Sequence, residues 1–360
     1  MKIKSVSIVG LGLIGGSIAK ALKSAGHNIE ICGYARNPET IKTALADKAI
    51  DRGLYSLDEI SRSDVVFICL PVDTTIEYFD KVAPLLKKNS ILTDVASVKT
   101  ALQDKWDSLT SEGIYFGGHP MTGKEKGGYD SSDPLLFENS VYILSEFVKN
   151  HPMSGDFITL IDSLGCRVTF LDPKLHDKIV ANVSHLPQLL SVALVNSMAQ
   201  YSGDTRFIDF AAGGFRDMTR IASSLFNIWD PIVLNNKESI LSSFDRLMNE
   251  LEKMKKEVVS GNMKSLEADF DKARITRDEI PKTRKGFITP IYDISIFIKD
   301  QPGVISAIST ALYKENINIK DIELLKIREG TGGNFRLSFE SEEAANRAKE
   351  IIRKIGFEAI

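Results

Sequence analysis

Three glycines near the start of the sequence have the spacing of a phosphate-binding turn. Gly10, Gly12 and Gly15 follow an apolar run at residues 3–9 and precede a helical pattern that ends at Gly26. In such a turn the first glycine permits the tight bend, the second leaves room for a pyrophosphate, and the third lets helix pack closely on strand. A strand before the turn and a helix after it favour this interpretation over an ordinary loop. The sequence therefore predicts dinucleotide binding at a helix N-terminus, by the residues Gly10, Leu11, Gly12, Leu13, Ile14 and Gly15.

A loop at residues 117–128 carries groups suited to proton transfer. It follows an apolar run at 114–116 and holds one histidine, His119, one glutamate and several glycines. A histidine with a pKa near neutrality, held beside a nicotinamide, can take the proton of an alcohol as hydride leaves. A loop histidine is more often structural, but the expected position of this one opposite the glycine turn favours catalysis.

Two arginines have the spacing of a carboxylate clamp. Arg216 and Arg220 stand four residues apart in a helix expected at 215–223, and so share one face. An arginine fork binds a carboxylate through two parallel hydrogen bonds. Solvated surface arginines are the alternative, and the residues alone do not decide between the two.

Ser97, His176 and His185 have ordinary structural roles that compete with catalysis. Ser97 stands at the start of a helix expected at 97–109, so it can cap that helix and still orient a substrate hydroxyl. His176 and His185 lie in a long helical stretch, where packing or capping is the simplest role.

Alternating strands and helices must position these groups. Such alternation indicates an α/β domain of the Rossmann type, with a mostly parallel sheet covered on both faces. Expected strands occupy residues 29–34, 65–70, 90–94, 114–116, 141–144 and 167–170, and expected helices occupy 73–86, 97–109 and 153–164. Ligands bind at the carboxyl ends of parallel strands. Leu70, Pro71, Ser97 and the loop at 117–128 are therefore expected to gather beside the glycine turn.

Residue 35 bears on the choice of nucleotide. NAD sites usually place an acid about 20 residues beyond the last loop glycine, where it binds the ribose hydroxyls. This sequence has Ala35 followed by Arg36. A missing carboxylate and an adjacent guanidinium favour the 2′-phosphate of NADP. NAD, with Arg36 stacked on the adenine, is the alternative.

The pattern changes after residue 171. Residues 172–283 show no convincing strand, and the stretch at 174–200 is apolar around most of its circumference, which indicates burial on several sides. We expect an all-α domain whose first helix is buried against a second subunit of a homodimer. The polar, basic segment at 284–290 is a linker. Residues 291–360 form a compact α+β domain, and residues 1–171 form the dinucleotide-binding domain.

Composition argues against several functions. The 360-residue chain is 43% hydrophobic and 26% charged, with a net charge of −3 and a pI near 6.0. It therefore has no electrostatic footprint for nucleic acid or an anionic membrane. No signal peptide and no run of about 20 apolar residues is evident. Three widely spaced cysteines, without disulfide framework or metal-ligand spacing, fit a reducing cytoplasm.

Five motifs together resemble the prephenate dehydrogenase family of tyrosine biosynthesis. They are residues 6–17 (VSIVGLGLIGGS), 94–99 (DVASVK), 118–125 (GHPMTGKE), 184–187 (SHLP) and 213–222 (GGFRDMTRIA). Each motif alone would be weak, but all five occur in the family order, and the resemblance covers about residues 3–280. The tail, with Asp-Gln-Pro-Gly at 300–303 before its first helix, is similar to ACT domains, which have a ferredoxin-like fold and commonly bind amino acids.

The resemblance implies oxidative decarboxylation of prephenate to 4-hydroxyphenylpyruvate, with hydride transfer to NAD or NADP. By this resemblance His119 would take the hydroxyl proton or share it, and Ser97 would orient that hydroxyl. Arg220 would bind a substrate carboxylate, with Glu125 nearby. It further implies a substrate site that includes Thr122, Gly123, Glu125, His185, Gln188, Arg220 and Trp229, and a tyrosine effector site that includes Gly303 and Asn316.

Two departures from the family pattern leave alternatives open. Many members have a second histidine after the His-Leu-Pro motif, where this chain has Gln188, so arogenate is an alternative substrate. Ala35 departs from the members that use NAD. A β-hydroxyacid dehydrogenase is a further alternative, although the Gly-His-Pro loop argues against it. A non-catalytic amino-acid sensor that binds nucleotide is another, and the absence of a basic DNA-reading module weakens it.

Overall fold

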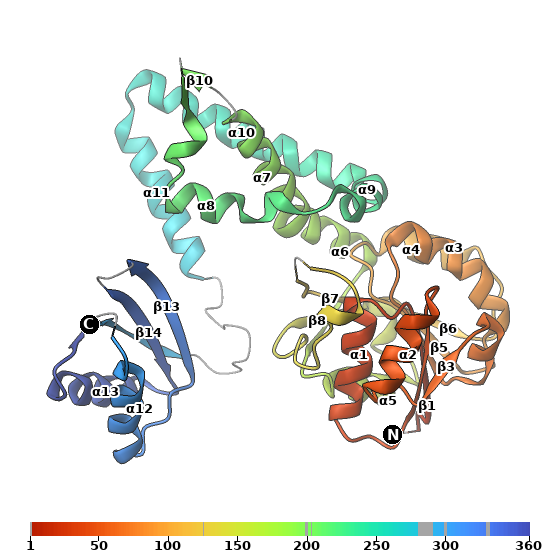
Figure 1. Cartoon of the computed structure of the whole chain (residues 1–360). Helices are drawn as coiled ribbons and strands as arrows, with labels where there is room; N and C mark the ends of the chain where they lie inside the picture. Colours follow the sequence, from red (N-terminus) through yellow and green to blue (C-terminus); the bar gives the residue numbers. More distant parts are fainter. Residues whose placement is uncertain are drawn as a thin grey trace. The chain divides into compact units, whose positions relative to one another are not determined.

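The chain forms two compact units, Met1–Leu266 and Glu267–Ile360. A computed structural model describes residues 2–124, 126–198, 201–202, 204–279, 291–298, 301–328 and 332–360. The first unit contains a parallel α/β domain and most of a helical region, and the second contains a small α+β domain (Figure 1).

A six-stranded parallel sheet is the centre of the first unit. Its strands lie in the order β3-β2-β1-β4-β5-β6, and every neighbouring pair is parallel. The strands are β1 (Ser5–Val9), β2 (Glu30–Tyr34), β3 (Arg52–Leu54), β4 (Val65–Ile68), β5 (Ile91–Asp94) and β6 (Ile114–Phe116). The strand order reverses between β1 and β4, and α/β sheets of this kind bind ligands at that switch point. The parallel sheet predicted from the alternating pattern is confirmed, and β3 is an additional edge strand.

Helices cover both faces of this sheet because successive strand residues point to opposite sides. In β1, Ile8 faces an apolar core shared with α1, α2 and α5, whereas Val9 faces a second core shared with α3 and α4. These helices are α1 (Leu13–Ser24), α2 (Pro38–Ala46), α3 (Val72–Val82), α4 (Thr100–Asp107) and α5 (Ser154–Asp162). The unit also has short 3₁₀ turns at Leu57–Arg62, Ala83–Leu85, Tyr129–Ser131, Glu146–Val148, Phe207–Phe210 and Arg220–Ser223.

The last strands of the α/β domain form a separate sheet. This sheet has the order β7-β8-β9, made by β7 (Gly118–Pro120), β8 (Val141–Ser145) and β9 (Arg167–Leu171). The pair β7–β8 is antiparallel and the pair β8–β9 is parallel. The expectation that residues 141–144 and 167–170 extend the main parallel sheet is therefore wrong. An alternating pattern identifies strands, but it does not say which strands pair.

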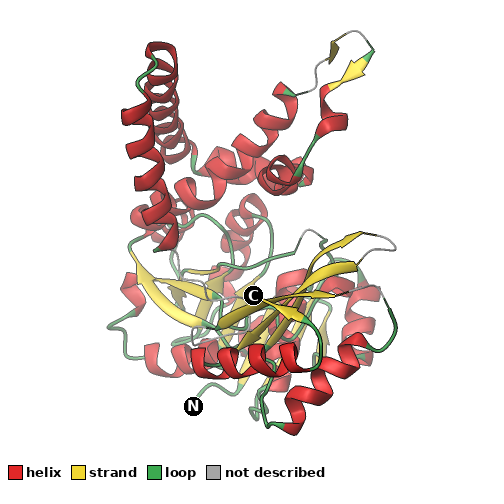
Figure 2. Ribbon diagram, turned by 90° about the vertical axis from the view of Figure 1, so that its left-hand side faces the viewer, coloured by secondary structure: helices red, strands yellow, loops and turns green. Residues whose placement is uncertain are grey.

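A helical region follows the α/β domain. It consists of α6 (Pro173–Val180), a π-helical turn (Ala181–His185), α7 (Leu186–Ser197), α8 (Gly213–Thr219), α9 (Phe226–Asn235), α10 (Lys237–Ser260) and α11 (Met263–Asp278), which continues into the second unit. A two-stranded hairpin, β10 (Tyr201–Ser202) and β11 (Thr205–Arg206), projects from these helices (Figure 2). α8 ends at Thr219 and a 3₁₀ turn starts at Arg220, so the single helix expected at 215–223 is interrupted.

The first helices of this region expose apolar side chains in the isolated chain. Leu175, Val183 and Val192 are 47%, 61% and 36% exposed. Among the described residues, one helical run, Pro173–Ser197, is long and apolar enough to cross a membrane by length and composition alone. A single helix of this kind is weak evidence for a membrane span, because helices of soluble proteins pass the same test. The burial expected at 174–200 is thus incomplete within one chain.

The second unit contains a four-stranded antiparallel sheet with two helices on one face (Figure 1). Its elements are β12 (Tyr292–Ile298), α12 (Val304–Lys314), β13 (Asp321–Arg328), β14 (Gly332–Phe339), α13 (Glu342–Lys354) and β15 (Glu358–Ala359), with strand order β13-β14-β12-β15. Ile296 and Phe339 from the sheet pack against Ile308 and Ile352 from the helices. This βαββαβ order is the ferredoxin-like fold expected for the tail.

Candidate active site

The glycine turn between β1 and α1 has the geometry of a dinucleotide site. Gly10 has φ +104°, and a Cβ there would lie 2.5 Å from the carbonyl oxygen of Cys69. A Cβ at Gly15 would lie 2.1 Å from the carbonyl oxygen of Gly10, so only glycine lets α1 approach β1 this closely. A Cβ at Gly12 would meet nothing within 4 Å. The backbone at Gly12 therefore leaves open the space that a side chain would fill, which fits a bound phosphate group.

The start of α1 offers donors to such a group. The helix begins at Leu13 with Gly12 as its N-cap, and no side chain caps it. The first N–H groups of a helix have no partner within the helix, and together with the helix dipole they attract anions. A dinucleotide pyrophosphate thus fits the backbone from Leu11 to Ile14.

The loops after β4 and β2 flank the glycine turn. Leu70 follows β4 and its Cδ2 would lie 2.8 Å from a Cβ at Gly10, while Pro71 is the N-cap of α3. On the other side, the N–H of Gly10 donates to the carbonyl of Tyr34 at the end of β2 (2.8 Å). Leu70 and Pro71 therefore lie at the switch point, as the sequence suggested.

Arg36 is exposed in the loop between β2 and α2. Its neighbour Ala35 packs partly against the apolar core. The first acid after β2 is Glu39, whose carboxylate pairs with Lys42 at 2.7 Å. The end of β2 thus presents a guanidinium without an adjacent carboxylate.

A buried ion pair joins the end of β5 to β7. The Lys99 ammonium bonds to Oδ1 of Asp94, and these side chains are 3% and 0% exposed. Lys99 Nζ also donates to the carbonyl of Gly118 (2.7 Å), and the hydroxyl of Tyr115 donates to Asp94 Oδ2 (2.6 Å). Burial lowers the pKa of Lys99, although the Asp94 carboxylate opposes that change. This network fixes the backbone directly before His119, at the carboxyl edge of the parallel sheet.

His119, His176 and Asp177 form a chain of hydrogen bonds. Nδ1 of His119 lies 2.8 Å from Nε2 of His176, and Nδ1 of His176 lies 2.8 Å from Oδ1 of Asp177. The Asp177 carboxylate also accepts the backbone N–H groups of Lys99 (2.7 Å) and Thr100 (2.8 Å) at the start of α4. All three side chains of the chain are buried. The helical region therefore supplies two residues that support a histidine of the α/β domain.

The buried surroundings keep these two histidines uncharged at neutral pH. Burial is the largest cause that lowers the pKa of His119 well below its usual value, and His176 and Lys99 lower it further. Burial also lowers the pKa of His176, although its hydrogen bond to Asp177 opposes this. For Asp177, burial disfavours ionisation, but hydrogen bonds from His176 and Thr100 outweigh burial and lower the pKa. The result is two neutral imidazoles that end on a carboxylate.

His185 lies close to this chain. Its Nδ1 is 3.2 Å from Nδ2 of Asn236, and its ring meets the Trp229 ring edge-on, with centroids 6.1 Å apart. Burial lowers the pKa of His185 to about 4. Its Nε2 is buried and has no hydrogen-bond partner within the described part of the chain. An orphaned buried donor or acceptor is costly, so this atom is a candidate for contact with a ligand.

The π-helical turn explains how His176 and His185 come together. In an uninterrupted α-helix, residues nine apart face roughly opposite sides. The wider turn at Ala181–His185 changes this phase, and such turns are frequent at functional sites. Both histidines then connect to Asp177, since Nδ2 of Asn236 also donates to the Asp177 carbonyl (2.8 Å).

The structure gives Gln188 a partner near Arg220. Gln188 is buried, and its Nε2 donates to the carbonyl of Ile221 at 2.9 Å. This amide therefore holds the 3₁₀ turn that begins at Arg220. Arg220 itself is exposed, and Arg216 lies on α8, in a different element.

The remaining predicted residues have less definite roles in the structure. Ser97 is half-buried after β5, but α4 begins at Thr100 with Lys99 as its N-cap, so Ser97 does not cap that helix. The Thr122 hydroxyl donates to the carbonyl of Leu136 (3.0 Å). Gly123 is exposed. Glu125 lies outside the described residues. No group of three or more metal-ligating side chains occurs in the described ranges.

Several residues of the cluster were missed by reasoning from the sequence. Asp94 and Lys99 delimit one of the family-like motifs, but their residue types alone indicate no role, and Asp177 simply follows a histidine whose simplest role is packing. Asn236 stands at the boundary before α10 and has no distinguishing sequence signal. Its role is visible only from its contacts.

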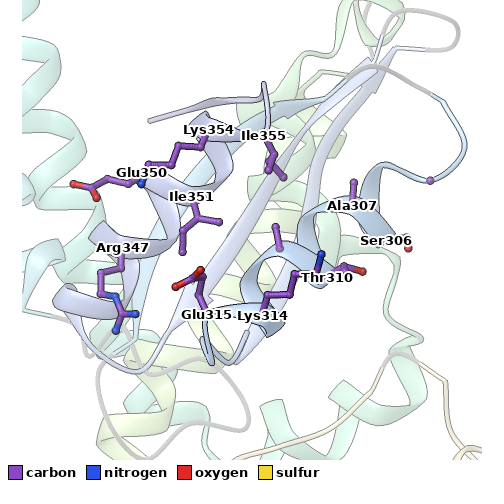
Figure 3. A pocket seen from close by; sticks show the side chains of 12 residues that line it. Ser306, Ala307, Thr310, Lys314, Glu315, Arg347, Glu350, Ile351, Lys354 and Ile355 are labelled. Carbon is purple, nitrogen blue, oxygen red and sulfur yellow. The ribbon is translucent and has the colours of Figure 1, made fainter.

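The predicted effector residues lie in the second unit. Gly303 (φ +88°) precedes α12, and Asn316 (φ +55°) follows it, both with left-handed backbone. Gly303 also lines a groove of about 750 Å³ between α12 and α13, shown in Figure 3. The groove carries both signs of charge, from Lys314, Glu315, Arg347, Glu350 and Lys354.

Dehydrogenases that use a nicotinamide dinucleotide share the arrangement of the first unit, with the nucleotide at the switch point of a parallel sheet. The chain is an NAD(P)-dependent oxidoreductase of this class. It belongs to the prephenate dehydrogenase family, since residues 18–168 match the family's nucleotide-binding domain and 172–272 match its dimerization domain. Residues 292–357 match the ACT domain. The family and the fold class predicted from the sequence are confirmed.

Individual relatives agree with this assignment. The prephenate dehydrogenase of Bacillus subtilis (strain 168) is 34% identical over 353 residues, which cover 97% of this chain and 95% of the relative. The crystal structure of prephenate dehydrogenase from A. aeolicus with hydroxyphenyl propionate and NAD+ has a TM-score of 0.71 and 31% identity, covering 78% of this chain and 99% of that chain. Synechocystis arogenate dehydrogenase has a TM-score of 0.68 and 27% identity, covering 77% of this chain and 100% of that chain.

Proposed function

We propose that the chain oxidises and decarboxylates prephenate to 4-hydroxyphenylpyruvate in tyrosine biosynthesis. Near full-length similarity to a prephenate dehydrogenase supports the substrate. The observation that carries the chemistry is the buried chain from His119 through His176 to Asp177, because it holds a neutral imidazole at the edge of the sheet where the nucleotide binds.

In this mechanism, bound nicotinamide supplies an acceptor for hydride. As hydride leaves the carbon that bears the ring hydroxyl, the hydroxyl proton passes to His119 and a ketone forms. Loss of the ring carboxylate as CO2 then moves an electron pair through the ring to that oxygen, which takes a proton and becomes the phenol. Aromatisation supplies most of the driving force, so the protein has to position the substrate and polarise its hydroxyl. General base catalysis of this kind contributes roughly 10²–10⁴-fold.

We assign the remaining site residues to substrate positioning. Ser97 orients the ring hydroxyl, and Arg220 binds a carboxylate. The other substrate contacts are Thr122, Gly123, Glu125, His185, Gln188 and Trp229. The Nε2 of His185, which is buried and has no partner among the described residues, supports its place in this group.

We propose NADP as the preferred cofactor. The backbone from Gly10 to Gly15 holds the pyrophosphate, and Leu70 and Pro71 border the nicotinamide side. The exposed Arg36, with no acid between it and β2, supports binding of a 2′-phosphate. NAD is the alternative, and the A. aeolicus relative was solved with NAD+.

We further propose a cytoplasmic homodimer with domains at 1–171, 172–283 and 291–360, inhibited by tyrosine. The apolar surface exposed on the helical region supports dimerisation. The left-handed turns at Gly303 and Asn316 flank α12 of the ACT domain, which is the proposed effector site.

A steady-state assay that crosses prephenate and arogenate with NAD and NADP tests these proposals. Formation of reduced nicotinamide is followed at 340 nm for each of the four pairs. We expect the highest kcat/KM with prephenate and NADP. Arogenate is the second candidate substrate, because Gln188 is uncharged where many relatives have histidine and an arogenate dehydrogenase shares the fold. Absence of turnover with all four pairs would contradict the proposed function.

A further inference from the structure

Asp177 connects to two histidines of the site, each through one intermediate residue. Its carboxylate reaches His119 through His176, and its backbone carbonyl reaches His185 through Asn236. We propose that Asp177 is a positioning residue that fixes opposite tautomers on these histidines, so that Nε2 is a hydrogen-bond acceptor in His119 and a donor in His185. The consequence for catalysis rests on the proposed function, whereas the tautomers themselves do not.

The connection from Asp177 through His176, which we call the first arm, determines which ring nitrogen of His119 carries the proton. A carboxylate can only accept hydrogen bonds, so Nδ1 of His176, 2.8 Å from Asp177, carries a proton. Neutral His176 then has a lone pair on Nε2. Nδ1 of His119 lies 2.8 Å from that lone pair and must donate to it. Neutral His119 therefore has its lone pair on Nε2.

The connection from Asp177 through Asn236, the second arm, gives His185 the opposite tautomer. A backbone carbonyl can only accept, so the amide nitrogen of Asn236, not its oxygen, faces the Asp177 carbonyl (2.8 Å). This contact fixes the amide orientation, which the ring contacts alone would leave open. The second N–H of the same nitrogen faces Nδ1 of His185 at 3.2 Å, so Nδ1 accepts. Neutral His185 therefore carries its proton on Nε2, the atom that is buried without a partner among the described residues.

The surroundings of Asp177 suit it to this role. Its two carboxylate oxygens accept N–H groups from Lys99 and Thr100 at the start of α4, in addition to His176. Neither oxygen is free to rotate towards another partner, and the ionised form is favoured. The α/β domain thus holds Asp177 in place, and Asp177 in turn orients His119 through His176 and His185 through Asn236.

The two tautomers match opposite needs of one substrate. A hydroxyl that loses its proton requires an acceptor, which is Nε2 of His119. A substrate oxygen held in place requires a donor, which is Nε2 of His185. When His119 takes the hydroxyl proton, its positive charge is shared through the hydrogen bond to His176, which ends on the Asp177 carboxylate. If His119 and His185 had the same tautomer, either the contact of His119 with the hydroxyl proton or the contact of His185 with the substrate oxygen would be repulsive.

Histidine side-chain ¹⁵N–¹H correlation spectra of the free, full-length protein at pH 7.5 test the tautomers directly. The chain has only 5 histidines, so single His→Gln variants assign each ring. We expect His119 and His176 to be protonated on Nδ1 and His185 on Nε2. The same tautomer in His119 and His185, or the reverse pair, would overturn the proposal, and neither result requires any substrate.

Two variants separate the arms. In Asn236→Asp, a carboxylate faces Nδ1 of His185, so a proton should appear on that Nδ1 while the spectrum of His119 stays unchanged. In His176→Phe, Nδ1 of His119 loses its acceptor, so the Nδ1-protonated population of His119 should fall while His185 stays unchanged. A variant spectrum identical to wild type in the targeted ring would contradict that arm. If a variant does not fold, the wild-type spectrum still shows whether His119 and His185 have the proposed tautomers.

Kinetics then test the consequence. We expect His176→Phe to lower kcat by about tenfold or more with little change in KM, within the range that general base catalysis supplies. Asn236→Asp should change KM more than kcat. His151→Gln, outside this cluster, is the matched control and should leave both constants unchanged. Predicted tautomers without turnover would refute the proposed function alone, whereas normal turnover with other tautomers would refute this inference alone.

Discussion

At the scale of single residues, His119 is the group whose removal should most clearly affect chemistry. Asparagine keeps a hydrogen-bonding side chain near Nδ1 but cannot take a proton. We expect His119→Asn to lower kcat by roughly 10²–10⁴-fold with little change in KM, because the lost interaction forms mainly in the transition state. The measurement is steady-state kinetics at 340 nm. His27→Asn, in the loop between α1 and β2, is the control and should keep wild-type rates; near-normal kcat in His119→Asn would remove this residue from the chemistry.

The buried histidines should also make stability depend on pH. Burial lowers the folded-state pKa of His119 and His176, and that of His185 to about 4. In the unfolded chain they titrate near 6.5. Below about pH 6.5 the unfolded state therefore binds more protons than the folded state. The free energy of unfolding then decreases as the pH is lowered, by up to about 3 kcal/mol for His185 alone near pH 4.

Melting temperatures measured from pH 8 to pH 4 check this expectation. The Tm should be nearly constant above about pH 6.5 with respect to these groups and should fall below it. His185→Gln removes one of the three titrations, so its Tm should fall less steeply over the same range. An equal slope in this variant and in wild type would show that His185 is not held neutral in the folded protein.

Residues 35 and 36 should control the choice of cofactor. Arg36 is exposed at the end of β2, and Ala35 offers no acceptor for ribose hydroxyls. Arg36→Ala should raise KM for NADP by about 10- to 100-fold, since loss of a charged hydrogen bond is worth about 1.5–3 kcal/mol, and should change KM for NAD little. Ala35→Asp should favour NAD by repelling the 2′-phosphate. Equal effects on both cofactors would indicate that Arg36 contacts the shared part of the nucleotide.

At the scale of elements, the β1–α1 turn separates packing from ligand binding. A Cβ at Gly15 would lie 2.1 Å from a carbonyl oxygen, whereas a Cβ at Gly12 would meet no protein atom within 4 Å. Gly15→Ala should therefore destabilise the fold by about 1–3 kcal/mol. Gly12→Ala should keep the wild-type Tm but weaken nucleotide binding about tenfold or more, because its methyl group takes the place of a phosphate. Calorimetric titration with NADP and thermal unfolding distinguish the two; loss of stability in Gly12→Ala would contradict this division.

The elements that the sequence predicted well are those whose signals are local. The strand-glycine-helix order at residues 3–26 and the turn before α12 are short-range patterns, and the structure has both. The separate β7-β8-β9 sheet was not predicted, because pairing depends on contacts between residues far apart in sequence. The interruption between α8 and the 3₁₀ turn at Arg220 was missed for a similar reason. There, the side-chain amide of Gln188 on α7 donates to the backbone carbonyl of Ile221, and no local sequence pattern shows this contact.

The site was predicted only in part, for the same physical reason. The sequence can propose His119 and the glycine turn as site residues because each lies in a motif whose residue types suit one chemistry. The partners of His119 come from the helical region, and a bond such as that between His176 and His119 joins residues 57 apart in sequence. Asn236 looks like an ordinary residue before a helix, and only its position beside Asp177 and His185 gives it a role.

At the scale of the whole molecule, the proposed catalytic residues and the proposed regulatory domain lie in different units of the chain. The glycine turn, the histidine chain and His185 all lie within Met1–Leu266, and the ACT domain lies within Glu267–Ile360. The ACT domain has its own apolar core. An effector that binds there can act on catalysis only by favouring one of at least two states of the full chain.

Tyrosine inhibition should therefore depend on the second unit. We expect tyrosine to inhibit the full chain, and a shortened chain that ends at residue 283 to keep activity while losing this inhibition, because it lacks the ACT domain. Initial rates over a tyrosine titration, with phenylalanine as the matched control ligand, measure both properties. If the shortened chain is inactive, Gly303→Val in the full chain is the second test: Gly303 has φ +88°, which valine rarely adopts, so the turn before α12 must change. Tyrosine sensitivity that persists unchanged in both variants would place the inhibitory site in the first unit, where tyrosine would compete with the substrate.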